Sequence, residues 1–410
     1  MSLITIISTI IIVLATTDFM FPNMPRLKND IFKVSFLLTY FLFTIKYYYG
    51  PDIDTYVPHY EENIKTISYV FANLSNMSFE PGYNIFCSIS KSLGLSFWAM
   101  TAVVSTIYFS AIYQLFKQLK TAKTFALMIL VVMDNGIMYA AIRQCLAVSM
   151  FIFMILALQK KNYINTLLFL ILSISFHKSA IFAITIVLIA AFIQNSTLKK
   201  YSFEVLLTLL CILTIVPLIN LIEPIIYFLP LSWDTLKSIE HHLLLGRSIQ
   251  VVFLVYFVTL ICINYFTINK TSKNNIIKTS VVAGFILIVL FYQYFYVLNR
   301  MRSYFLPIII LYTINLSLQY FENKQYKIPF ATCVRQLAIL FMFTYVIFQT
   351  HTLENSYKKN KSQIHDCTTI FELKYSDKET IKQRQLKKAK IYWKEDFMDG
   401  SQNRLDKKND

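Results

Sequence analysis

DNGIMYAAIRQCLAVSMFIFMILALQKKNYINTLLFLILSISFHKSA, residues 134–180, predicts two apolar helices joined by the polar turn 159–162. The first run begins beside Arg143, and the second ends at His177. Each leg has about 16 or 17 residues, so at ~1.5 Å per helical residue it covers roughly 25 Å, close to the hydrocarbon thickness of a bilayer. Such a hairpin returns the chain to the membrane face that it left. Arg143 and His177 are therefore predicted to lie at the same face.

The composition of the whole chain is that of a membrane protein. Of its 410 residues 56% are hydrophobic and only 15% are charged, whereas soluble domains are about 45–50% apolar and about 25% charged. The sequence predicts an all-α, polytopic integral membrane protein with about 12 transmembrane helices. The predicted spans are 2–21, 31–49, 95–116, 124–140, 143–158, 163–177, 179–194, 202–222, 248–268, 276–298, 303–321 and 330–349.

The net charge of +16 does not indicate a nucleic-acid partner. Most Lys and Arg residues lie in alternate short turns between apolar runs, a distribution that marks those turns as cytoplasmic. The other segments are then outside: 50–94, 134–143, 177–178, 223–247 and 299–302. Since the six cysteines form no C-x-x-C pair, they predict neither a metal site nor a disulfide framework.

Two polar parts of the chain stand apart from the spans. In the first outer segment, around residues 80–94, Glu80-Pro81 suits a helix start, and the residues that follow predict an amphipathic helix lying in the membrane interface. Its apolar face would carry Tyr83, Phe86, Ile89 and Leu93, and its polar face Asn84, Ser88 and Lys91. At the other end, 350–410 reads as a polar, charged C-terminal tail after a transmembrane domain at 1–349.

Ionisable residues at the ends of apolar runs are the candidates for chemistry, because charge at membrane level is costly and usually functional. Arg143 has apolar neighbours on both sides, so it either binds an anion or is an interfacial residue that snorkels or pairs with Asp134. Arg300 and Arg302 place two cations outside, against the positive-inside pattern. Three arginines on one face favour phosphate or pyrophosphate binding over surface anchoring.

The other candidates each have a simpler alternative. His177 is an acid or base candidate, although a lone His at a helix end is more often a cap. Glu80 and Asp54 would accept a proton or bind sugar, or else serve as a helix-start acid and a turn residue. The tyrosines nearby, Tyr56 and Tyr83 among them, fit an interfacial aromatic belt better than a sugar platform.

Five short motifs in this order resemble the EpsG-type, Wzy-like polymerases of bacterial surface polysaccharides (O-antigen, capsule or exopolysaccharide). They are D-x-Y-x-x-x-Y at 54–60, E-P-G-Y at 80–83, I-R-Q-x-L-A at 142–147, F-H-K-S-A at 176–180 and R-x-x-x-Y-F at 300–305. The resemblance spans residues 1–349, and the tail lies outside it.

The resemblance implies a multi-pass protein of the cytoplasmic (inner) membrane and a metal-independent glycosyltransfer at its outer face, with no cofactor. The substrate would be an undecaprenyl-pyrophosphate-linked oligosaccharide embedded in membrane lipid, and a flippase and a chain-length regulator of the same pathway would be partners. Pyrophosphate would be bound by Arg143 and Arg300, and Glu80 or His177 would be the base. The substrate-binding residues would be Asp54, Tyr56, Tyr83, Gln144, Lys178, Arg302 and Tyr304.

Three other functions fit parts of the pattern. A flippase or transporter of lipid-linked sugars also needs an arginine-rich site, although normally in a central cavity, and the sequence shows no inverted repeat. A ligase-like membrane glycosyltransferase of the O-antigen type would differ from a polymerase in its acceptor. A membrane scaffold would use the outer charges for topology alone.

Overall fold

The computed structural model describes residues 3–21, 24–47, 52–195, 276–277, 279–281, 283–284, 295–323 and 379–383. Within these ranges the chain is helical and contains no β-strand, as predicted. Of the predicted spans, 202–222, 248–268 and 330–349 lie outside the described residues, as does the tail apart from 379–383. The chain divides into two compact units, the first formed by 1–150, 171–177 and 317–410 and the second by 151–170 and 178–316.

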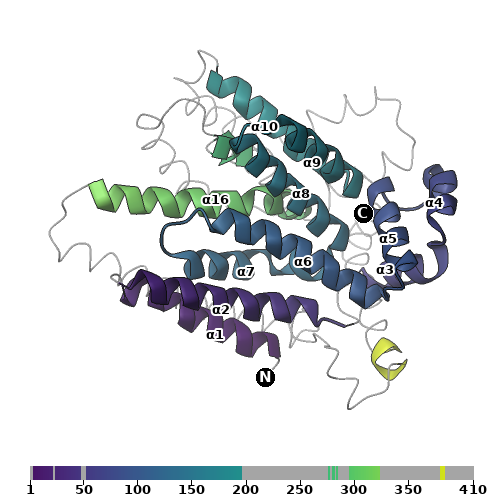
Figure 1. Ribbon diagram of the computed structural model, residues 1–410, viewed down its shortest axis with the longest axis horizontal. Helices are drawn as coiled ribbons and strands as arrows, with labels where there is room; N and C mark the ends of the chain where they lie inside the picture. Colours follow the sequence, from purple (N-terminus) through teal and green to yellow (C-terminus); the bar gives the residue numbers. More distant parts are fainter. Residues whose placement is uncertain are drawn as a thin grey trace, which may run out of the picture. The chain divides into compact units, whose positions relative to one another are not determined.

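The first unit contains a layer of four long helices: α1 (Leu3–Met20), α2 (Pro25–Thr44), α6 (Phe97–Phe116) and α7 (Lys123–Ala140), which lie side by side (Figure 1). Aromatic side chains fill the seam between α2 and α6. Phe36 meets Phe109 and Tyr113 edge-on, with ring centroids 5.5 and 5.3 Å apart. Edge-on aromatic pairs of this kind add to the stability of the layer.

Helix starts in this layer follow local chemistry. Pro25 is in the first turn of α2, where its fixed φ suits a helix start, so α2 begins earlier than the predicted span 31–49 and ends at Thr44. The Asp18 carboxylate of α1 accepts a hydrogen bond of 2.9 Å from the Phe125 backbone N–H. This bond satisfies one of the amide donors that the first turn of α7 leaves free.

Between α2 and α6, the 52–96 segment folds into short helices grouped at one end of the layer (Figure 1). They are α3 (Ile53–Pro58), the π-helix η1 (His59–Asn63), α4 (Ile67–Asn73), the 3₁₀ turn η2 (Leu74–Asn76) and α5 (Pro81–Ser92). One hydrogen bond joins the two ends of this segment: the Tyr60 hydroxyl donates to the Leu95 carbonyl at 2.7 Å.

The helix predicted in the first outer segment is confirmed as α5, but two residues of its predicted polar face are buried in the protein. Asn84 and Ser88, predicted on the outward polar face, are fully buried, whereas Ile89 and Leu93 are 44% and 71% exposed. The reason is that the irregular backbone around α5 presents carbonyl groups that need donors. The Asn84 side chain donates to the Phe79 carbonyl, and Ser88 donates to that of Lys65.

Lys91 closes the C-terminal end of η1. Its Nζ donates to the carbonyls of Tyr60, Glu61 and Ile64 at 3.0, 2.9 and 2.6 Å. We expect Lys91→Met to lower the free energy of unfolding by about 2 kcal/mol, because hydrogen bonds to a charged donor are worth about 1.5–3 kcal/mol and solvent replaces part of the loss. Thermal unfolding of the full-length protein in detergent measures the loss. Lys117→Met, at the end of α6, is the control for removing a lysine charge, and an equal effect of both substitutions would contradict this role.

The second unit is built from α10 (Ser179–Asn195) and from parts of α8 (Ile142–Gln159), α9 (Tyr163–Phe176) and α16 (Phe295–Asn323). Phe151 meets the rings of Tyr304 and Phe305 edge-on, each at 5.4 Å. The predicted outer loop at 299–302 is wrong, because α16 runs through it without a break. The two arginines there suggest a turn, but no Gly or Pro interrupts the helix between the two apolar runs.

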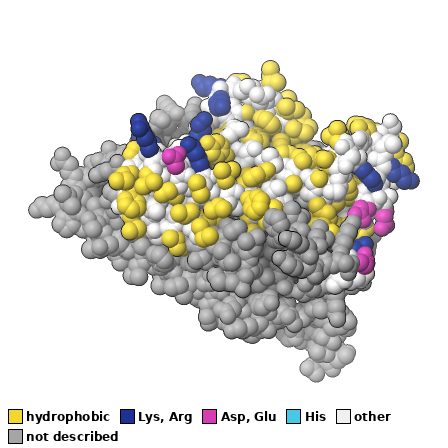
Figure 2. Space-filling view, turned by 60° about the horizontal axis from the view of Figure 1, so that its bottom comes forward, with side chains coloured by type: hydrophobic (Ala, Val, Ile, Leu, Met, Phe, Trp, Pro, Cys, Tyr) yellow, Lys and Arg dark blue, Asp and Glu magenta, His cyan; other side chains and the backbone are white. Residues whose placement is uncertain are grey.

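Two helices in the described ranges, α6 and α8, are long and apolar enough to cross a membrane. Three further apolar stretches, Ile10–Met20, Tyr163–Phe176 and Ser179–Ala191, are shorter. Figure 2 shows hydrophobic side chains over much of the described surface, with charged side chains towards its margins. Large apolar groups are well exposed, for example Leu37 at 62% and Ile164 at 83%. Such exposed apolar faces are typical of a membrane protein, while the total of about 12 spans stays a prediction.

Candidate functional site

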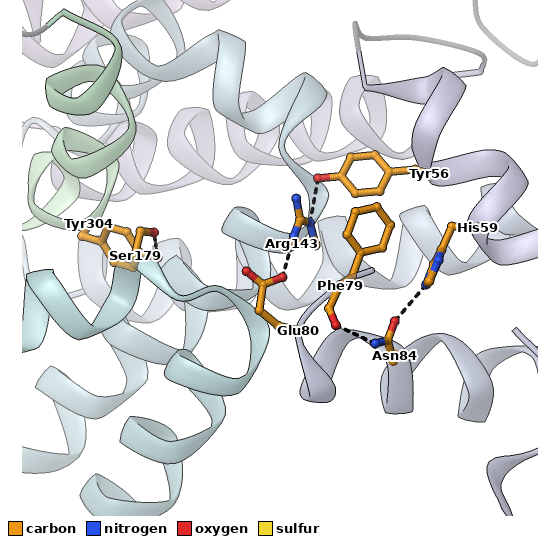
Figure 3. A network of polar contacts seen from close by, with 8 residues as sticks. All are labelled: Tyr56, His59, Phe79, Glu80, Asn84, Arg143, Ser179 and Tyr304. Atoms are coloured by element: carbon orange, nitrogen blue, oxygen red, sulfur yellow. Dashed lines mark hydrogen bonds and ion pairs between the residues drawn. The ribbon is translucent and has the colours of Figure 1, made fainter. Parts of the chain in front are cut away.

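Arg143 is the centre of a polar cluster in the first unit (Figure 3). It occupies the second position of α8, and only Ala141 separates α8 from α7. Its guanidinium forms an ion pair with Glu80 at 2.5 Å and donates from Nε to the Tyr56 hydroxyl at 3.2 Å. Four segments distant in sequence are involved, since Tyr56 comes from α3, Glu80 precedes α5, and His177 follows α9.

Aromatic rings support the guanidinium. Its carbon lies 4.2 Å from the ring centroid of Phe79 and 5.6 Å from that of Tyr56, both within the range of cation–π attraction. The two rings are 5.4 Å apart, and Tyr83 packs against both of them. Arg143 is thus held by rings on its face and by a carboxylate at its edge, and its orientation is set before any ligand binds.

The guanidinium still has capacity for a ligand. An arginine side chain has five N–H donors. Within the described part of the chain two of them are used, by Glu80 and Tyr56, so three remain. With 22% of its side chain exposed, Arg143 is reachable from outside the protein. This arrangement suits recognition of phosphate oxygens.

The protonation states follow from the geometry. Burial by itself raises the pKa of the Glu80 carboxyl, but the positive charges of Arg143 and His177 outweigh it, so the pKa lies below its ordinary value and Glu80 is ionised at neutral pH. Burial raises the pKa of Tyr56 to about 12, against the opposing effect of Arg143. The Tyr56 hydroxyl therefore keeps its proton, and it can donate to an anion while it accepts from Arg143.

Local sequence features explain why Glu80 and His177 lie near Arg143. Glu80 is the residue before α5, but its carboxylate makes no capping hydrogen bond, which leaves it for Arg143. Gly82 packs so closely on the end of α9 that a Cβ there would lie 2.8 Å from the Ser175 carbonyl oxygen. Phe86 meets Phe176 edge-on at 6.1 Å. The E-P-G-Y segment therefore packs directly against the end of α9 that leads into F-H-K-S-A.

His59 and Phe79 belong to this cluster, and the sequence reasoning missed both. Asn84 donates from Nδ2 to the Phe79 carbonyl at 2.7 Å, so its Oδ1 is the acceptor for His59 Nε2 at 2.8 Å. His59 therefore carries its proton on Nε2 and leaves Nδ1 as an acceptor. Burial lowers the pKa of His59, with a contribution from Arg143 and against the Asn84 hydrogen bond, so the ring is neutral at pH 7. The sequence spacing could have indicated His59, because it follows Tyr56 by three residues and so lies on the same side of a helix.

The remaining predicted site residues are distributed as follows. Gln144 is buried beside Arg143 at 1% exposure. Asp54 is in the first turn of α3, and its side chain is outside the described residues. The second unit contains Lys178, Arg300, Arg302 and Tyr304. Arg300 is exposed on α16, and Tyr304 is fully buried, with its hydroxyl 2.9 Å from that of Ser179 (Figure 3).

We expect Glu80→Gln to lower the free energy of unfolding by about 2 kcal/mol, because it leaves a largely buried guanidinium without its counter-charge. The lowered pKa also gives the effect a pH dependence. The ion pair contributes stability above the ordinary carboxyl pKa of 4.5, and that stability is lost as the pH falls through the lower folded-state value. Acid should therefore lower the melting temperature of the wild type more than that of Glu80→Gln.

The measurement is a series of thermal melts between about pH 7 and about pH 3. Glu61→Gln is the matched control, since it removes an exposed carboxylate from η1 in the same unit. If the melting temperatures of the wild type and Glu80→Gln fall equally as the pH is lowered, the ion pair does not stabilise the fold.

Comparison with known protein families places most of the chain in one of them. The model of the EpsG family matches residues 31–360, a range that includes the Arg143 cluster and both arginines of α16. No curated protein and no solved structure matches the chain.

Proposed function

Because this chain belongs to the EpsG family, we propose that it is a polysaccharide polymerase that joins undecaprenyl-pyrophosphate-linked repeat units at the outer face of the cytoplasmic membrane. The observation that supports this function best is the pre-oriented Arg143, which has three N–H donors that the described residues leave unused and that suit phosphate oxygens. The protein would be multi-pass, with a membrane domain at 1–349 and the tail at 350–410.

In the proposed reaction, a sugar hydroxyl of the acceptor repeat unit attacks the anomeric carbon of the donor glycan. A new C–O glycosidic bond forms, and the bond between the anomeric carbon and the pyrophosphate oxygen breaks. Undecaprenyl pyrophosphate leaves with the bonding electrons, and the hydroxyl proton passes to a base on the protein. No oxidant, reductant or cofactor enters this balance.

Each residue of the cluster has a role in this scheme. Arg143 would stabilise the negative charge that develops on the leaving pyrophosphate, as preorganised donors do in other transfers. Its partner Glu80 neutralises one unit of positive charge, so a pyrophosphate needs further cations, for which Arg300, Arg302 and Lys178 are our candidates. Tyr56 would add a neutral donor.

The base would be Glu80 or His177. Glu80 is ionised, but its ion pair with Arg143 weakens it as a proton acceptor. His177 follows directly on α9 and interacts electrostatically with Glu80, and its neutral imidazole would be the form that accepts the proton. A pH–rate profile distinguishes them, because an imidazole base gives an acidic limb at higher pH than a carboxylate base does.

The test uses full-length protein in liposomes with a lipid-linked repeat unit as the only substrate. We expect a ladder of longer lipid-linked glycans and release of undecaprenyl pyrophosphate, with or without a metal chelator. Transport of labelled lipid across the bilayer without chain growth would overturn the proposal in favour of a flippase. Transfer of the glycan to a different acceptor would indicate a ligase.

A further inference from the structure

A polar pocket opens in the first unit beside His59. It has a volume of about 340 Å³ and lies between η1, α4 and the segment 76–78. Its size is at the lower end of the range for small-molecule sites, enough for a single sugar ring and its substituents. The lining side chains used below are Glu62, Asn63, Lys65, Tyr69, Asn76 and Ser78.

The lining offers hydrogen-bonding groups that the fold does not use. The side chains of Glu62, Asn63, Asn76 and Ser78 are exposed, and within the described ranges none of them has a hydrogen bond or ion pair. Two amides, one carboxylate and one hydroxyl give both donors and acceptors. Groups of this mixture match the hydroxyls and amides of a sugar, each of which also donates and accepts.

The charge in the pocket argues against an anionic ligand. Glu62 contributes one negative charge and Lys65 one positive charge, so the lining has no net charge. Lys65 lies over the ring of Tyr69 at 4.7 Å, and Tyr69 is 39% exposed. A partly exposed ring beside neutral polar groups is suited to the apolar face of a sugar ring. A pyrophosphate, by contrast, requires an excess of positive charge, which this lining does not supply.

The pocket shares a wall with the Arg143 cluster. His59 lines the pocket, and its ring meets that of Phe79 at 4.4 Å, the closest ring contact in the described part of the cluster. The Phe79 ring also contacts the Arg143 guanidinium, at 4.2 Å. His59 is the first residue of a π-helix, a rare conformation that is frequent at functional sites. A layer of aromatic rings therefore separates this polar pocket from the Arg143 guanidinium.

We propose that this pocket, separated from Arg143 by the rings of His59 and Phe79, is a binding subsite for one sugar residue of the lipid-linked glycan. The identification of the ligand as that glycan rests on the proposed function, whereas sugar binding itself is measured without turnover. Asn63 and Asn76 would hydrogen-bond the hydroxyls, and Tyr69 would contact the face of the ring.

The experiment uses full-length protein in nanodiscs. The probe is the lipid-free repeat-unit oligosaccharide, released by mild acid from the surface polysaccharide of the producing cells and labelled at its reducing end. We expect the double variant Asn63→Ala/Asn76→Ala to weaken binding about tenfold, as the loss of two neutral hydrogen bonds predicts. The double variant should fold normally because neither side chain has a partner in the described structure.

Asn165→Ala is the matched control, because Asn165 is also exposed but lies on α9, outside the pocket. It should bind the oligosaccharide as the wild type does. Unchanged affinity in the double variant, or no binding of the probe by the wild type, would overturn the subsite. If the wild type binds the probe through these asparagines but does not extend chains, the subsite stands and the polymerase function fails.

Discussion

Arg143→Ala is expected to lower the rate of chain extension by a factor of about 100 to 1,000, the loss typical of removing one preorganised donor from a developing oxyanion. The physical reason is that the guanidinium is already oriented by Glu80, Tyr56 and Phe79 before the substrate arrives. Little reorganisation is then needed when charge builds up on the pyrophosphate. The measurement is the initial rate of extension in liposomes, normalised to folded protein.

Arg143→Ala also leaves the Glu80 carboxylate, only 8% exposed, without its partner. A loss of rate in the single variant could therefore come from a disturbed fold. The double variant Glu80→Gln/Arg143→Ala removes both charges, and it should recover thermal stability relative to the single variant while remaining inactive. If the double variant extends chains at the wild-type rate, Arg143 serves only to neutralise Glu80, and its assignment to pyrophosphate is wrong.

Arg143→Lys provides a graded comparison. It keeps the positive charge, but an ammonium group cannot bind Glu80, Tyr56 and a phosphate in the fixed fork of a guanidinium. We expect an extension rate between those of Arg143→Ala and the wild type. A rate equal to that of the wild type would mean that charge alone is required at this position.

Gly82→Ala is expected to destabilise the protein by about 2 kcal/mol, within the range for forcing an extra methyl group into a packed contact. The new Cβ would lie 2.8 Å from the Ser175 carbonyl oxygen and at least as close to the Ser175 side chain, so the start of α5 must move away from α9. Because Glu80 immediately precedes α5, the same displacement should also lower the rate of extension.

Two further variants test whether the clash with Ser175 causes the loss of stability in Gly82→Ala. Ser175→Gly removes the side-chain part of the clash but leaves the carbonyl oxygen, so it should restore part of the stability lost in Gly82→Ala. Gly94→Asn is the control, since Gly94 has a positive φ of 74° and a Cβ added there would meet no atom within 4 Å, and asparagine tolerates that conformation. Normal melting and normal extension in Gly82→Ala would show that α5 and α9 do not pack this closely.

The sequence predicted the helical hairpin well. The expected helices 143–158 and 163–177 differ from α8 and α9 by one residue at each changed end, because long apolar runs with a polar turn leave little choice. The predicted meeting of Arg143 and His177 at one end of the hairpin also agrees with the structure, in which the charges of both act on Glu80. Counting residues was enough for this inference.

Other parts of the site were beyond the reach of sequence patterns. The pairing of Arg143 with Glu80 depends on how the 52–96 segment folds back, and that path is set by buried hydrogen bonds such as those of Asn84. Hydropathy gives no weight to a buried asparagine, so the burial of Asn84 and Ser88 on α5 was not predicted. His59 and Phe79 were missed because aromatic residues near a membrane read as an interfacial belt.

The ring of Phe79 separates two kinds of residue with different freedom to vary. On one side, Arg143 binds both Glu80 and Tyr56, so a substitution in any of these three disturbs the others. On the other side, Asn63 and Asn76 have no side-chain partners in the described structure, so they can be exchanged at little cost to the fold. Under the proposed function, a protein divided in this way would acquire a preference for a different sugar through changes in the pocket alone, while the residues around Arg143 stay as they are. On the same proposal, the pocket is the place to begin when redesigning which glycan the protein binds.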